Sequence, residues 1–520
     1  MALIVGINAK YVHTSLSIRY LRNAVGGNAQ IFECSINDSV YAIAEEIFSF
    51  RQKHILFSCY LWNIEMALKI CEILKKADNE IIISLGGPEA SFNSDELIKN
   101  PYIDHVICGE GEVGIGDFIQ NIKPKGVYDF GAVDNLDTIP FPYIDGELED
   151  LSDRLIYYET SRGCPYSCAF CLSSAIKGVR FKSIHIVKEE ILKFIKSGVK
   201  LVKLVDRTFN ADNKRAVELV EFIKSNSKGT SFHFEVKAES MSDELIESLL
   251  SAPKDMFQLE IGVQSTDCHT LSRINRKEDF KKLKDVTERL AKNKNMHLHL
   301  DLIAGLPKEN LKTFIKSFND VFSLRPDDLQ LGFLKKLHGA QITDKDGTFS
   351  SFPPYEVIST EAMSYEEIIM LKGVSATLER VYNSGSFKNT IEYLLKFYET
   401  PFEMFYDLSR YTDFKKPISR KNLYEVLYKF GVDKFGDERL KGELIYDFCL
   451  YNRDYLSFME KTEEIKKKTM LFVRDEDAIV KHFPEYIDIS PSERYKKIRI
   501  EKINENFYAF DPQRCKAVLL

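Results

Sequence analysis

The sequence predicts an α/β protein with two parallel β-sheets and a third, mainly helical part. Short β-rich runs alternate with amphipathic helical runs over residues 1–122, and this alternation predicts a doubly wound parallel sheet. The alternation resumes over residues 155–352 as six βα units, which predict a partial (β/α)6 barrel, short of the eight units of a closed barrel. From residue 353 the chain becomes rich in Tyr and Phe without regular alternation, so a helical domain is expected over 353–520.

The elements of the N-terminal domain are placed by β-branched runs that end at Gly, Pro or Asn. A doubly wound sheet binds its ligands at the carboxyl ends of its strands, and the loops expected there are rich in small residues. The expected strands are residues 2–8, 30–36, 54–62, 80–87 and 105–111, and the expected helices are residues 15–25, 40–51, 64–77, 94–99 and 113–122.

A linker is expected at residues 123–154, where Pro and Gly recur beside an acidic run. The barrel follows it. Its expected strands are residues 155–160, 199–206, 232–236, 256–263, 296–304 and 328–334, and its expected helices are residues 184–197, 212–226, 242–251, 278–293 and 309–323.

Composition excludes several classes of protein. The net charge of −7 is that of a poor non-specific nucleic-acid binder, so bulk nucleic acid is not expected as a partner. No uncharged apolar run approaches the ~18 residues of a membrane span, so no membrane partner is expected. The first residues lack the features of a signal peptide, and the ten cysteines suit a reducing compartment, so a cytoplasmic location is expected.

Three cysteines follow the first barrel strand in the segment SRGCPYSCAFCLSS (161–174). Cys164, Cys168 and Cys171 have C-x3-C-x2-C spacing, and three thiolates on one short loop can hold three irons of a cubane cluster. Phe170, an aromatic residue inside the motif, also fits a cluster loop. A structural zinc site would need a fourth ligand, usually from a second pair, and the sequence offers no such pair. The spacing therefore predicts a 4Fe–4S cluster with one open iron.

This loop resembles the cluster loop of the radical S-adenosylmethionine (SAM) enzymes. The order of an N-terminal doubly wound domain, the cysteine loop and a partial barrel resembles the cobalamin-dependent class of that superfamily. Phrases such as GGPEAS, CGEGE, EIGVQS and HLHLDLIAGLP resemble one subfamily that carries a C-terminal domain of unknown function. The resemblance implies that the open iron chelates SAM, that its reductive cleavage gives a 5′-deoxyadenosyl radical, and that residues 1–122 bind cobalamin.

Polar residues at the carboxyl ends of the barrel strands are the candidates for binding SAM. The resemblance implies that Asp206 and Arg207 hold the methionine moiety. Glu260, Gln264 and Ser265 suit ribose hydroxyls, and Arg273 could pair with the methionine carboxylate. The resemblance further implies that the backbone at Gly305 and Pro307 lies against the adenine ring, and Phe170 is a further candidate for contact with SAM. No residue is assigned as catalytic.

Candidates for cobalamin contact lie at the strand ends of the first sheet. The pattern D-x-H-x-x-G, which supplies a histidine below cobalt in some cobalamin proteins, corresponds here to Asn8, Lys10 and His13, so that histidine is absent from its usual position. GEGEVG formally matches a dinucleotide fingerprint, but it follows the fifth strand instead of the first, and its carboxylates would repel a pyrophosphate. The other candidates, expected to pack against a large flat ligand, are Ser58, Gly86, Gly87, Gly109, Glu110 and Gly111.

The hypothesis for function is a radical SAM enzyme with cobalamin that transfers a methyl group to, or rearranges, an unactivated carbon of a small-molecule or modified-nucleoside substrate. One alternative is a cobalamin-independent radical SAM lyase with a vestigial N-terminal domain, and another is a corrinoid-sensing or electron-transfer protein. The enzyme would need a reductant such as flavodoxin or ferredoxin. Substrate choice is expected to reside in residues 353–520, with Tyr382 and Asn383 as candidates.

Overall fold

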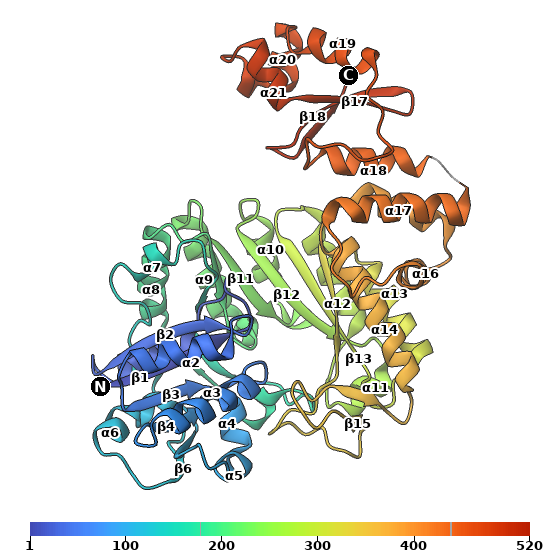
Figure 1. Ribbon diagram of the computed structural model, residues 1–520. Coiled ribbons are helices and arrows are strands. Elements are labelled where there is room, and N and C mark those ends of the chain that lie inside the picture. Colours follow the sequence, from blue (N-terminus) through green and yellow to red (C-terminus); the bar gives the residue numbers. More distant parts are fainter. Residues whose placement is uncertain (177, 437–438) are drawn as a thin grey trace. The chain divides into compact units, whose positions relative to one another are not determined.

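The computed structural model describes residues 1–176, 178–436 and 439–520 (Figure 1). The chain forms two compact units. The first unit comprises residues 1–317, 324–326 and 332–365, and the second comprises residues 318–323, 327–331 and 366–520. The first unit thus extends beyond the expected boundary at residue 352.

The N-terminal domain is a six-stranded parallel sheet with the order β2-β1-β3-β4-β5-β6. The chain leaves β1 in one direction for β2 and returns to β3 on the other side, so the order reverses between β1 and β3, where ligands of such sheets bind. The strands are β1 (Ala2–Asn8), β2 (Ala29–Ser35), β3 (His54–Ser58), β4 (Ile82–Gly86), β5 (His105–Cys108) and β6 (Gly126–Asp129).

Helices cover both faces of this sheet, as its apolar strands require. The side chains of β1 alternate between two apolar cores, one built with α2 and α3 and the other with α1 and α6. Figure 1 shows the helices in these positions. They are α1 (Leu16–Ala24), α2 (Val40–Ser49), α3 (Ile64–Ala77), α4 (Pro88–Phe92), α5 (Ser94–Leu97) and α6 (Ile115–Gln120).

The expected linker contains the sixth strand of the sheet. In β6, Gly126 pairs with His105 and Asp129 pairs with Cys108, in parallel. The segment GVYD is short and its flanking prolines suggested a loop, which is why the strand was not expected. Residues after it form a 3₁₀ turn (Leu136–Thr138) and a short helix, α7 (Glu147–Asp150), before the barrel begins.

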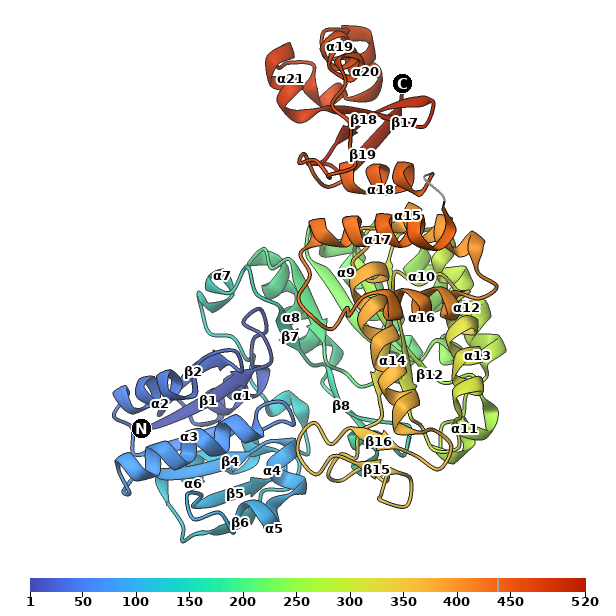
Figure 2. The same ribbon diagram turned by 45° about the vertical axis from the view of Figure 1, so that its right-hand side comes forward.

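The barrel has the six expected strands, in the order β14-β13-β12-β11-β10-β7. Figure 2 shows the helices that follow them on the outside of the sheet. The strands are β7 (Ile156–Tyr158), β10 (Leu201–Leu204), β11 (Ser231–Val236), β12 (Phe257–Gln264), β13 (His297–Ala304) and β14 (Asp328–Phe333). The helices are α8 (Ile184–Lys196), α9 (Asn213–Asn226), α10 (Asp243–Leu250), α11 (Cys268–Arg273), α12 (Phe280–Lys292) and α13 (Leu311–Phe322).

Two antiparallel hairpins complete the first unit. The first, β8 (Ser161–Cys164) with β9 (Gly178–Phe181), directly follows β7 and carries the first cysteine of the motif. The second, β15 (Thr348–Phe349) with β16 (Val357–Ser359), lies beyond the barrel. In this second region the Tyr355 hydroxyl donates to the buried Glu89 carboxylate, 2.5 Å away, which ties the segment to α4 of the N-terminal domain.

The second unit is mainly helical, as expected, but it ends in a small antiparallel sheet that was not expected. The β-branched residues in RIEKI and the aromatic residues in NFYAFD are the signal for two of its strands. The helices are α14 (Tyr365–Thr377), α15 (Lys388–Leu394), α16 (Pro401–Tyr411), α17 (Arg420–Phe435), α18 (Leu440–Cys449), α19 (Glu463–Phe472), α20 (Glu476–His482) and α21 (Pro491–Lys497), and the strands are β17 (Arg499–Ile503), β18 (Asn506–Asp511) and β19 (Lys516–Leu519).

The two residues proposed for substrate choice have packing partners inside the second unit. The Asn383 amide donates to the Leu329 carbonyl (3.1 Å) and accepts from the Leu329 backbone N–H (3.0 Å). The Tyr382 ring lies 5.0 Å from the Phe322 ring, centre to centre. Both residues therefore contribute to the fold, and their part in substrate choice stays a prediction.

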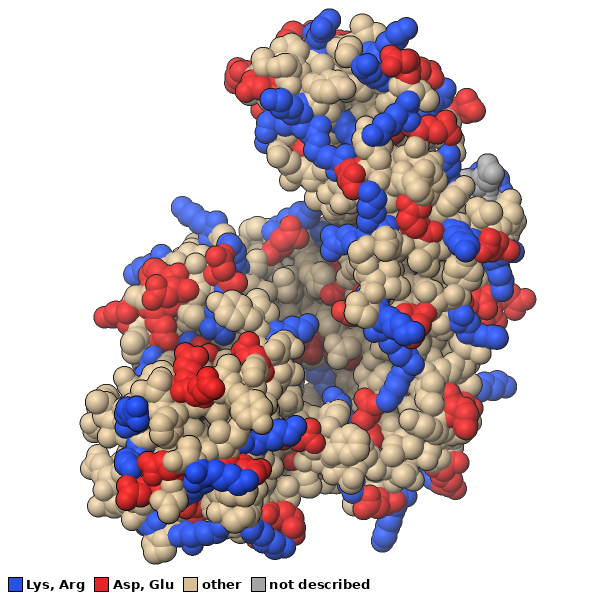
Figure 3. All heavy atoms as spheres, viewed as in Figure 1, with Lys and Arg blue, Asp and Glu red and all other residues tan. Residues whose placement is uncertain are grey.

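Acidic and basic side chains are interspersed over the face seen in Figure 3. Within the ranges that the structure describes, no helix is both long and apolar enough to cross a membrane.

Candidate functional site

The three motif cysteines lie on one loop at the carboxyl end of β7, where barrel enzymes place their chemistry. Cys164 ends β8, Cys168 lies in the following turn, and Cys171 precedes a short 3₁₀ helix over 172–175. All three thiols are free, and the Cys164 Sγ lies 3.5 Å from the Thr208 hydroxyl. Three free thiols on a single, partly buried loop are the donor set that a cubane cluster needs.

A site for a single metal ion would need several ligand side chains that converge on one point. In the part of the chain that the structure describes, no three His, Cys, Asp or Glu side chains converge on a point where one metal ion could be held. A cubane cluster does not require such convergence, because each cysteine binds a different iron. The residues present therefore fit the cluster that their spacing predicts.

A close backbone approach shapes the hairpin before Cys164. Gly163 has a φ of +98°, and a Cβ at this position would lie 2.1 Å from the Gly178 carbonyl oxygen of the opposite strand. Only glycine can occupy that position without moving the hairpin. The SRGC sequence thus fixes the backbone that presents the first cysteine.

Asp206, predicted to hold SAM, anchors the start of this hairpin. Its buried carboxylate accepts hydrogen bonds from the Thr160 N–H (2.9 Å), the Thr160 hydroxyl (2.6 Å) and the Ser161 hydroxyl. Burial raises the pKa of Asp206 despite these bonds. Arg207, next in the chain, is exposed. The structure thus gives Asp206 a role in positioning the cysteine hairpin, and contact of either residue with SAM stays a prediction.

The barrel strands alternate apolar side chains on their outer face with polar side chains on their inner face. In β12, Leu259 and Ile261 are buried, whereas Glu260 between them is partly exposed. Register places Glu260 between Glu235 of β11 and His299 of β13. The inner face of a closed barrel is normally filled by apolar side chains, so this polar lining indicates a ligand site.

Lys203 neutralises one carboxylate of this lining. Its Nζ lies 2.9 Å from the Glu260 carboxylate, and the His233 Nε2 lies 3.4 Å from the same group. Burial would raise the pKa of Glu260, but Lys203 outweighs it and the pKa is lowered. Burial lowers the pKa of His233 to about 4, and Lys203 adds to the shift, so this imidazole is neutral at pH 7.

Two further carboxyl groups of the lining resist ionisation. Burial raises the pKa of Glu235 to about 7, and the Glu260 charge adds to the shift. Burial also raises the pKa of Asp301, although the His299 Nε2 lies 3.0 Å from it. Acidic groups in such surroundings suit a ligand that carries positive charge or hydroxyl donors, as SAM does. Glu235, Asp301 and His299 were not among the predicted site residues.

Near the cysteines, the structure presents a different arginine from the predicted one. The Arg273 guanidinium lies in an ion pair with Asp346, a residue distant in sequence. Arg276 instead lies with its Nη1 3.8 Å from the Cys168 Sγ, and Glu278 holds its Nε at 2.6 Å. A guanidinium beside a thiolate stabilises negative charge on the sulfur. Arg276 was missed because its turn follows α11, and sequence gave no means to choose between the two.

Three of the other predicted SAM residues also have defined places. The Ser265 hydroxyl is buried and donates to the Glu309 carboxyl group at 2.5 Å, which turns it away from the barrel interior. Gln264 has a φ of +70°, and Gly262, at its side, leaves room for its amide. Gly305 has a φ of +80° at the end of β13. The remaining two, Phe170 and Pro307, lie on the cysteine loop and on the loop after β13. Binding of SAM by these residues stays a prediction.

The predicted cobalamin residues share one edge of the N-terminal sheet. Asn8 ends β1, Ser58 ends β3 and Gly86 ends β4, so the three strand ends border the reversal point of the sheet. Gly87 has a φ of +96°, and a Cβ there would lie 2.7 Å from the Cys59 carbonyl oxygen. Gly86 and Gly87 thus allow a close backbone approach at these strand ends, and contact of the residues with cobalamin stays a prediction.

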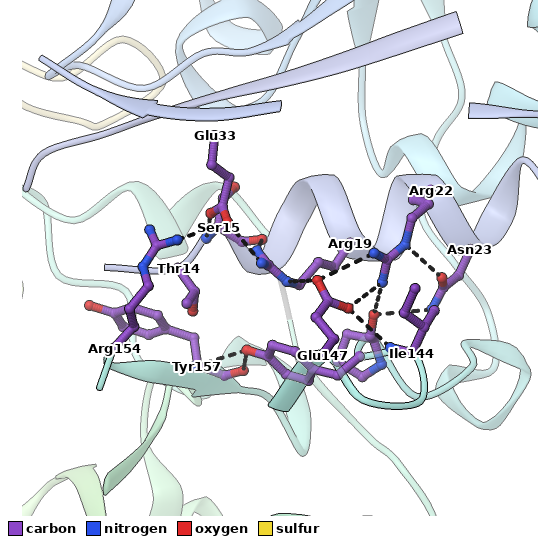
Figure 4. A network of polar contacts seen from close by, with 12 residues as sticks. Thr14, Ser15, Arg19, Arg22, Asn23, Glu33, Ile144, Glu147, Arg154 and Tyr157 are labelled. Carbon is purple, nitrogen blue, oxygen red and sulfur yellow. Dashed lines mark hydrogen bonds and ion pairs between the residues drawn. The ribbon is translucent and has the colours of Figure 1, made fainter. Parts of the chain in front are cut away.

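The loop after β1 is held by hydrogen bonds from several directions (Figure 4). The half-buried Glu33 carboxylate accepts from the Ser15 N–H (2.6 Å), the Asn8 amide (3.1 Å) and the Arg19 guanidinium (2.8 Å). Arg19 also reaches Glu147 at 2.9 Å, so the helix after the loop is tied to α7. This network fixes the loop that would lie below cobalt.

His13, the nearest imidazole on that loop, is already engaged. Its Nδ1 lies 2.6 Å from the Tyr157 hydroxyl of β7, and its carbonyl accepts from Asn8 and Arg154. Burial lowers the pKa of His13, and Lys10 adds to the shift. The Lys10 side chain itself is exposed. The loop therefore joins the N-terminal domain to the first barrel strand.

Glu110 and its neighbours at the end of β5 point toward the cysteine hairpin. Glu110 pairs with Arg162 at 2.9 Å and with Arg180 at 2.5 Å, and Glu112 pairs with Arg162 at 2.6 Å. A Cβ at Gly111 would lie 2.5 Å from the Leu21 side chain, so this glycine serves packing against α1. The structure directs both carboxylates at guanidinium groups, and the predicted contact of Glu110 with cobalamin stays a prediction.

Three family models match successive parts of the chain. Residues 2–118 match the B12 binding domain, residues 158–321 match the radical SAM superfamily, and residues 346–518 match a family described as a protein of unknown function, DUF4080.

Two curated relatives are methyltransferases. The chain is 28% identical over 309 residues to 2-(S-pantetheinyl)-carbapenam-3-carboxylate methyltransferase of Streptantibioticus cattleyicolor. It is 26% identical over 301 residues to the cobalamin-dependent radical SAM methyltransferase TokK of Streptomyces tokunonensis. Each match covers 50% of this chain and 43% of the relative, so the chain spans less than half the length of these two proteins.

Solved structures share the fold. The radical SAM methyltransferase TsrM of Kitasatospora setae, with cobalamin and a [4Fe-4S] cluster bound, matches with a TM-score of 0.55 at 14% identity, over 65% of this chain and 73% of that one. The cobalamin-dependent SAM radical enzyme OxsB matches with the same score and identity, over 92% of this chain and 75% of that one. The chain therefore combines a B12 binding domain, a radical SAM domain and a DUF4080 domain, each as its family model matches it.

Proposed function

We propose that this protein is a cobalamin-dependent radical SAM methyltransferase that acts on an unactivated carbon of a small-molecule or modified-nucleoside substrate. The observation that carries the proposal is that two candidate ligand sites lie next to each other in the first unit. The three-cysteine loop lies at the carboxyl end of β7. The loop after β1, at the carboxyl ends of the strands of the N-terminal sheet, contacts the same strand through His13 and Tyr157. The methyltransferase relatives support the reaction class.

The bound groups supply the chemistry: a cluster and SAM provide a radical, and cobalamin provides a methyl carrier. The chain's own residues bind and orient. Cys164, Cys168 and Cys171 would hold the cluster, and Arg276 stabilises negative charge on Cys168. Glu235 and Asp301 line the barrel where a sulfonium or ribose hydroxyls would lie. The strand ends at Asn8, Ser58 and Gly86 would hold the corrinoid.

The polar inner face of the barrel is the proposed substrate chamber. Lys203 and Glu260 form a hydrogen-bonded ion pair on this face, and the His233 Nε2 lies 3.4 Å from the same carboxylate. The apolar outer faces of β12 and β13 pack against helices and exclude water from the barrel wall. A polar group of the substrate would therefore be bound by this inner face. We further propose that the protein works in the cytoplasm with a flavodoxin or ferredoxin as reductant, consistent with its ten free cysteines.

The test is anaerobic reconstitution followed by incubation with SAM and a reductant. A methyltransferase of this class forms both 5′-deoxyadenosine and S-adenosylhomocysteine, and both require cobalamin-loaded protein for turnover. Formation of 5′-deoxyadenosine alone, with or without cobalamin, would support a cobalamin-independent lyase instead. Absence of both products would favour a corrinoid-sensing or electron-transfer protein. Changing Cys171 to Ala provides the cluster-free control.

A further inference from the structure

Five charged side chains form a cluster between the N-terminal sheet and the cysteine hairpin. Glu110 and Glu112 come from the loop after β5, and Glu159, Arg162 and Arg180 come from the segment between β7 and β9. We call these five residues the charge clamp. It serves neither the cluster nor SAM directly, and the assigned domains do not explain why it joins these two loops.

Arg162 is the centre of the clamp. Its guanidinium donates to Glu110 (2.9 Å), to Glu112 (2.6 Å) and to Glu159 (2.6 Å), so three carboxylates share one cation. Arg180 lies directly opposite Arg162 across the hairpin and supplies the second cation, which also binds Glu110. The Arg162, Glu110 and Glu112 side chains are 13–16% exposed, so water screens these pairs only partly.

The two ends of the clamp are each close to a cofactor site. On one side, Gly109 precedes Glu110 at the end of β5, and a Cβ there would lie 2.4 Å from the Gly131 carbonyl oxygen, so the loop has little freedom. On the other side, only Gly163 separates Arg162 from Cys164, and its tight contact with Gly178 makes the hairpin stiff. A displacement of either loop is therefore transmitted to the other through Arg162.

We propose that Arg162 is a positioning residue that couples cobalamin binding at the N-terminal sheet to the geometry of Cys164 in the cluster. The inference rests on the proposed function, because it needs both cofactors. A corrinoid bound against the loop at 109–112 would fix the positions of Glu110 and Glu112. These two carboxylates fix the guanidinium fork of Arg162, and Arg162 in turn fixes β8, which ends at Cys164. By linkage, an assembled cluster must strengthen cobalamin binding by the same factor as cobalamin stabilises the cluster.

The alternative is that the clamp only joins two parts of the first unit. Arg22 offers a matched control for that alternative. It too is a half-buried arginine, 12% exposed, and it joins α1 of the N-terminal domain to Glu147 of α7, but it lies on no loop that leads to a cysteine. A purely structural role predicts that Arg162→Gln and Arg22→Gln have the same kind of effect.

The experiment measures cobalamin affinity by absorbance titration of the full chain, before and after reconstitution of the cluster. In the wild-type protein we expect the cluster to tighten hydroxocobalamin binding by about fivefold or more. Arg162→Gln should reduce that ratio to one while each cofactor still binds singly. Arg162→Lys, which keeps the charge but not the fork, should restore part of the ratio, and Arg22→Gln should leave it unchanged.

The reciprocal measurement is the rate at which a chelator removes iron from the reconstituted protein. Cobalamin should slow iron loss in the wild type and in Arg22→Gln, but not in Arg162→Gln. Should Arg162→Gln not fold, Glu112→Gln removes one arm of the clamp and should lower the ratio in the same direction. A wild-type ratio of one, or an unchanged ratio in Arg162→Gln or Glu112→Gln, would overturn the coupling alone. Failure of the wild type to bind cobalamin would overturn the proposed function together with it.

Discussion

The two parallel sheets of the first unit place their polar residues in different ways. The N-terminal sheet is apolar on both faces, and its candidate ligand residues lie at one edge. Three polar side chains buried within it, His54, Ser84 and His105, bond to one another along the sheet, and the chain of hydrogen bonds ends on a backbone carbonyl. The barrel sheet is apolar only on its outer face, and its inner face presents Lys203, Glu260 and their neighbours.

This difference follows from how each sheet is covered. Helices on both sides of the N-terminal sheet leave only the strand ends for a ligand, so recognition there depends on glycine-rich loops. A partial barrel has helices on one side and an interior on the other, so every second residue of a strand can face a ligand. The same element type therefore yields an edge site in one domain and an interior site in the next.

The largest effect is expected at the cysteine loop. Changing Cys164, Cys168 or Cys171 to Ala removes one of three iron ligands, and reductive cleavage of SAM should fall below detection. Cys268→Ala, at an exposed cysteine of the same barrel, should retain the iron content and cleavage of the wild type. Iron analysis and quantification of 5′-deoxyadenosine check both statements. Zinc as the only bound metal, or equal iron loss in Cys268→Ala, would contradict the assignment.

The next effect separates the two faces of the barrel at neighbouring positions. Leu259 packs on the outer face, and Leu259→Ala should lower the free energy of unfolding by about 2–5 kcal/mol. Glu260 faces the interior, and Glu260→Gln should cost less stability, about 1–3 kcal/mol, because Lys203 loses its partner.

For the cleavage of SAM, the order of the two variants should be reversed, with the larger effect in Glu260→Gln. Cleavage of SAM per assembled cluster should fall about tenfold in Glu260→Gln, as the loss of one charged hydrogen bond implies, and should stay near the wild-type rate in Leu259→Ala. Urea unfolding and single-turnover assays provide the two measurements. An unchanged rate in Glu260→Gln would remove this face of the barrel from the site.

The order of two parallel sheets followed by a mainly helical region could be predicted from the sequence, and the assignment of the cluster ligands stays a prediction that rests on the cysteine spacing. The alternation of β-rich and helical runs located all six barrel strands within a few residues, because each strand is followed by an amphipathic helix or a turn, and the cysteine spacing is local to one loop. Side-chain partners were harder to predict. Arg273 turns to Asp346 and Ser265 turns to Glu309, and both partners are distant in sequence, so no local pattern indicated them. The strand β6 was missed because four residues carry too little periodicity.

A smaller effect is expected on the pH dependence of stability, from a carboxyl group buried under the helices of the barrel. Glu309 is fully buried, and burial raises its pKa to about 8, so it is mainly neutral at pH 7 in the folded protein and ionised in the unfolded one. Its contribution to stability is thus complete below pH ~4.5 and decreases as the pH rises toward 8, by up to about 3 kcal/mol at pH 7. Glu309→Gln should flatten this part of the stability profile.

Urea unfolding at pH 5 and pH 7.5 measures that slope. Glu235→Gln, on the inner face, should also flatten it, because burial raises the pKa of Glu235 to about 7. The two variants differ once SAM is bound. A ligand with a positive charge favours the ionised form of Glu235, so SAM should remove the slope that Glu235 contributes and leave that of Glu309 unchanged. The opposite pattern would place SAM on the wrong face of the barrel.

The smallest expected effect is at His13, where the edge site meets the barrel. In the wild-type protein, bound Co(II) cobalamin should show no nitrogen hyperfine coupling from a histidine, because Lys10 stands where a ligating histidine would be and the His13 Nδ1 lies 2.6 Å from the Tyr157 hydroxyl. His13→Ala should therefore leave the Co(II) electron paramagnetic resonance spectrum unchanged. Release of this imidazole toward cobalt would have to break its contact with Tyr157 and disturb a loop that Glu33 holds through Ser15 and Asn8. Tyr157→Phe tests that point directly, since it frees the imidazole without removing it. If histidine coupling appears in Tyr157→Phe and is lost again when His13 is also changed to Ala, Tyr157 is the residue that keeps the lower face of cobalt free. If histidine coupling is present in the wild type and lost in His13→Ala, His13 itself is the ligand of cobalt. The N-terminal sheet would then bind its cofactor through a side chain of the loop after β1, and the contrast with the barrel, whose side chains face the ligand, would no longer hold.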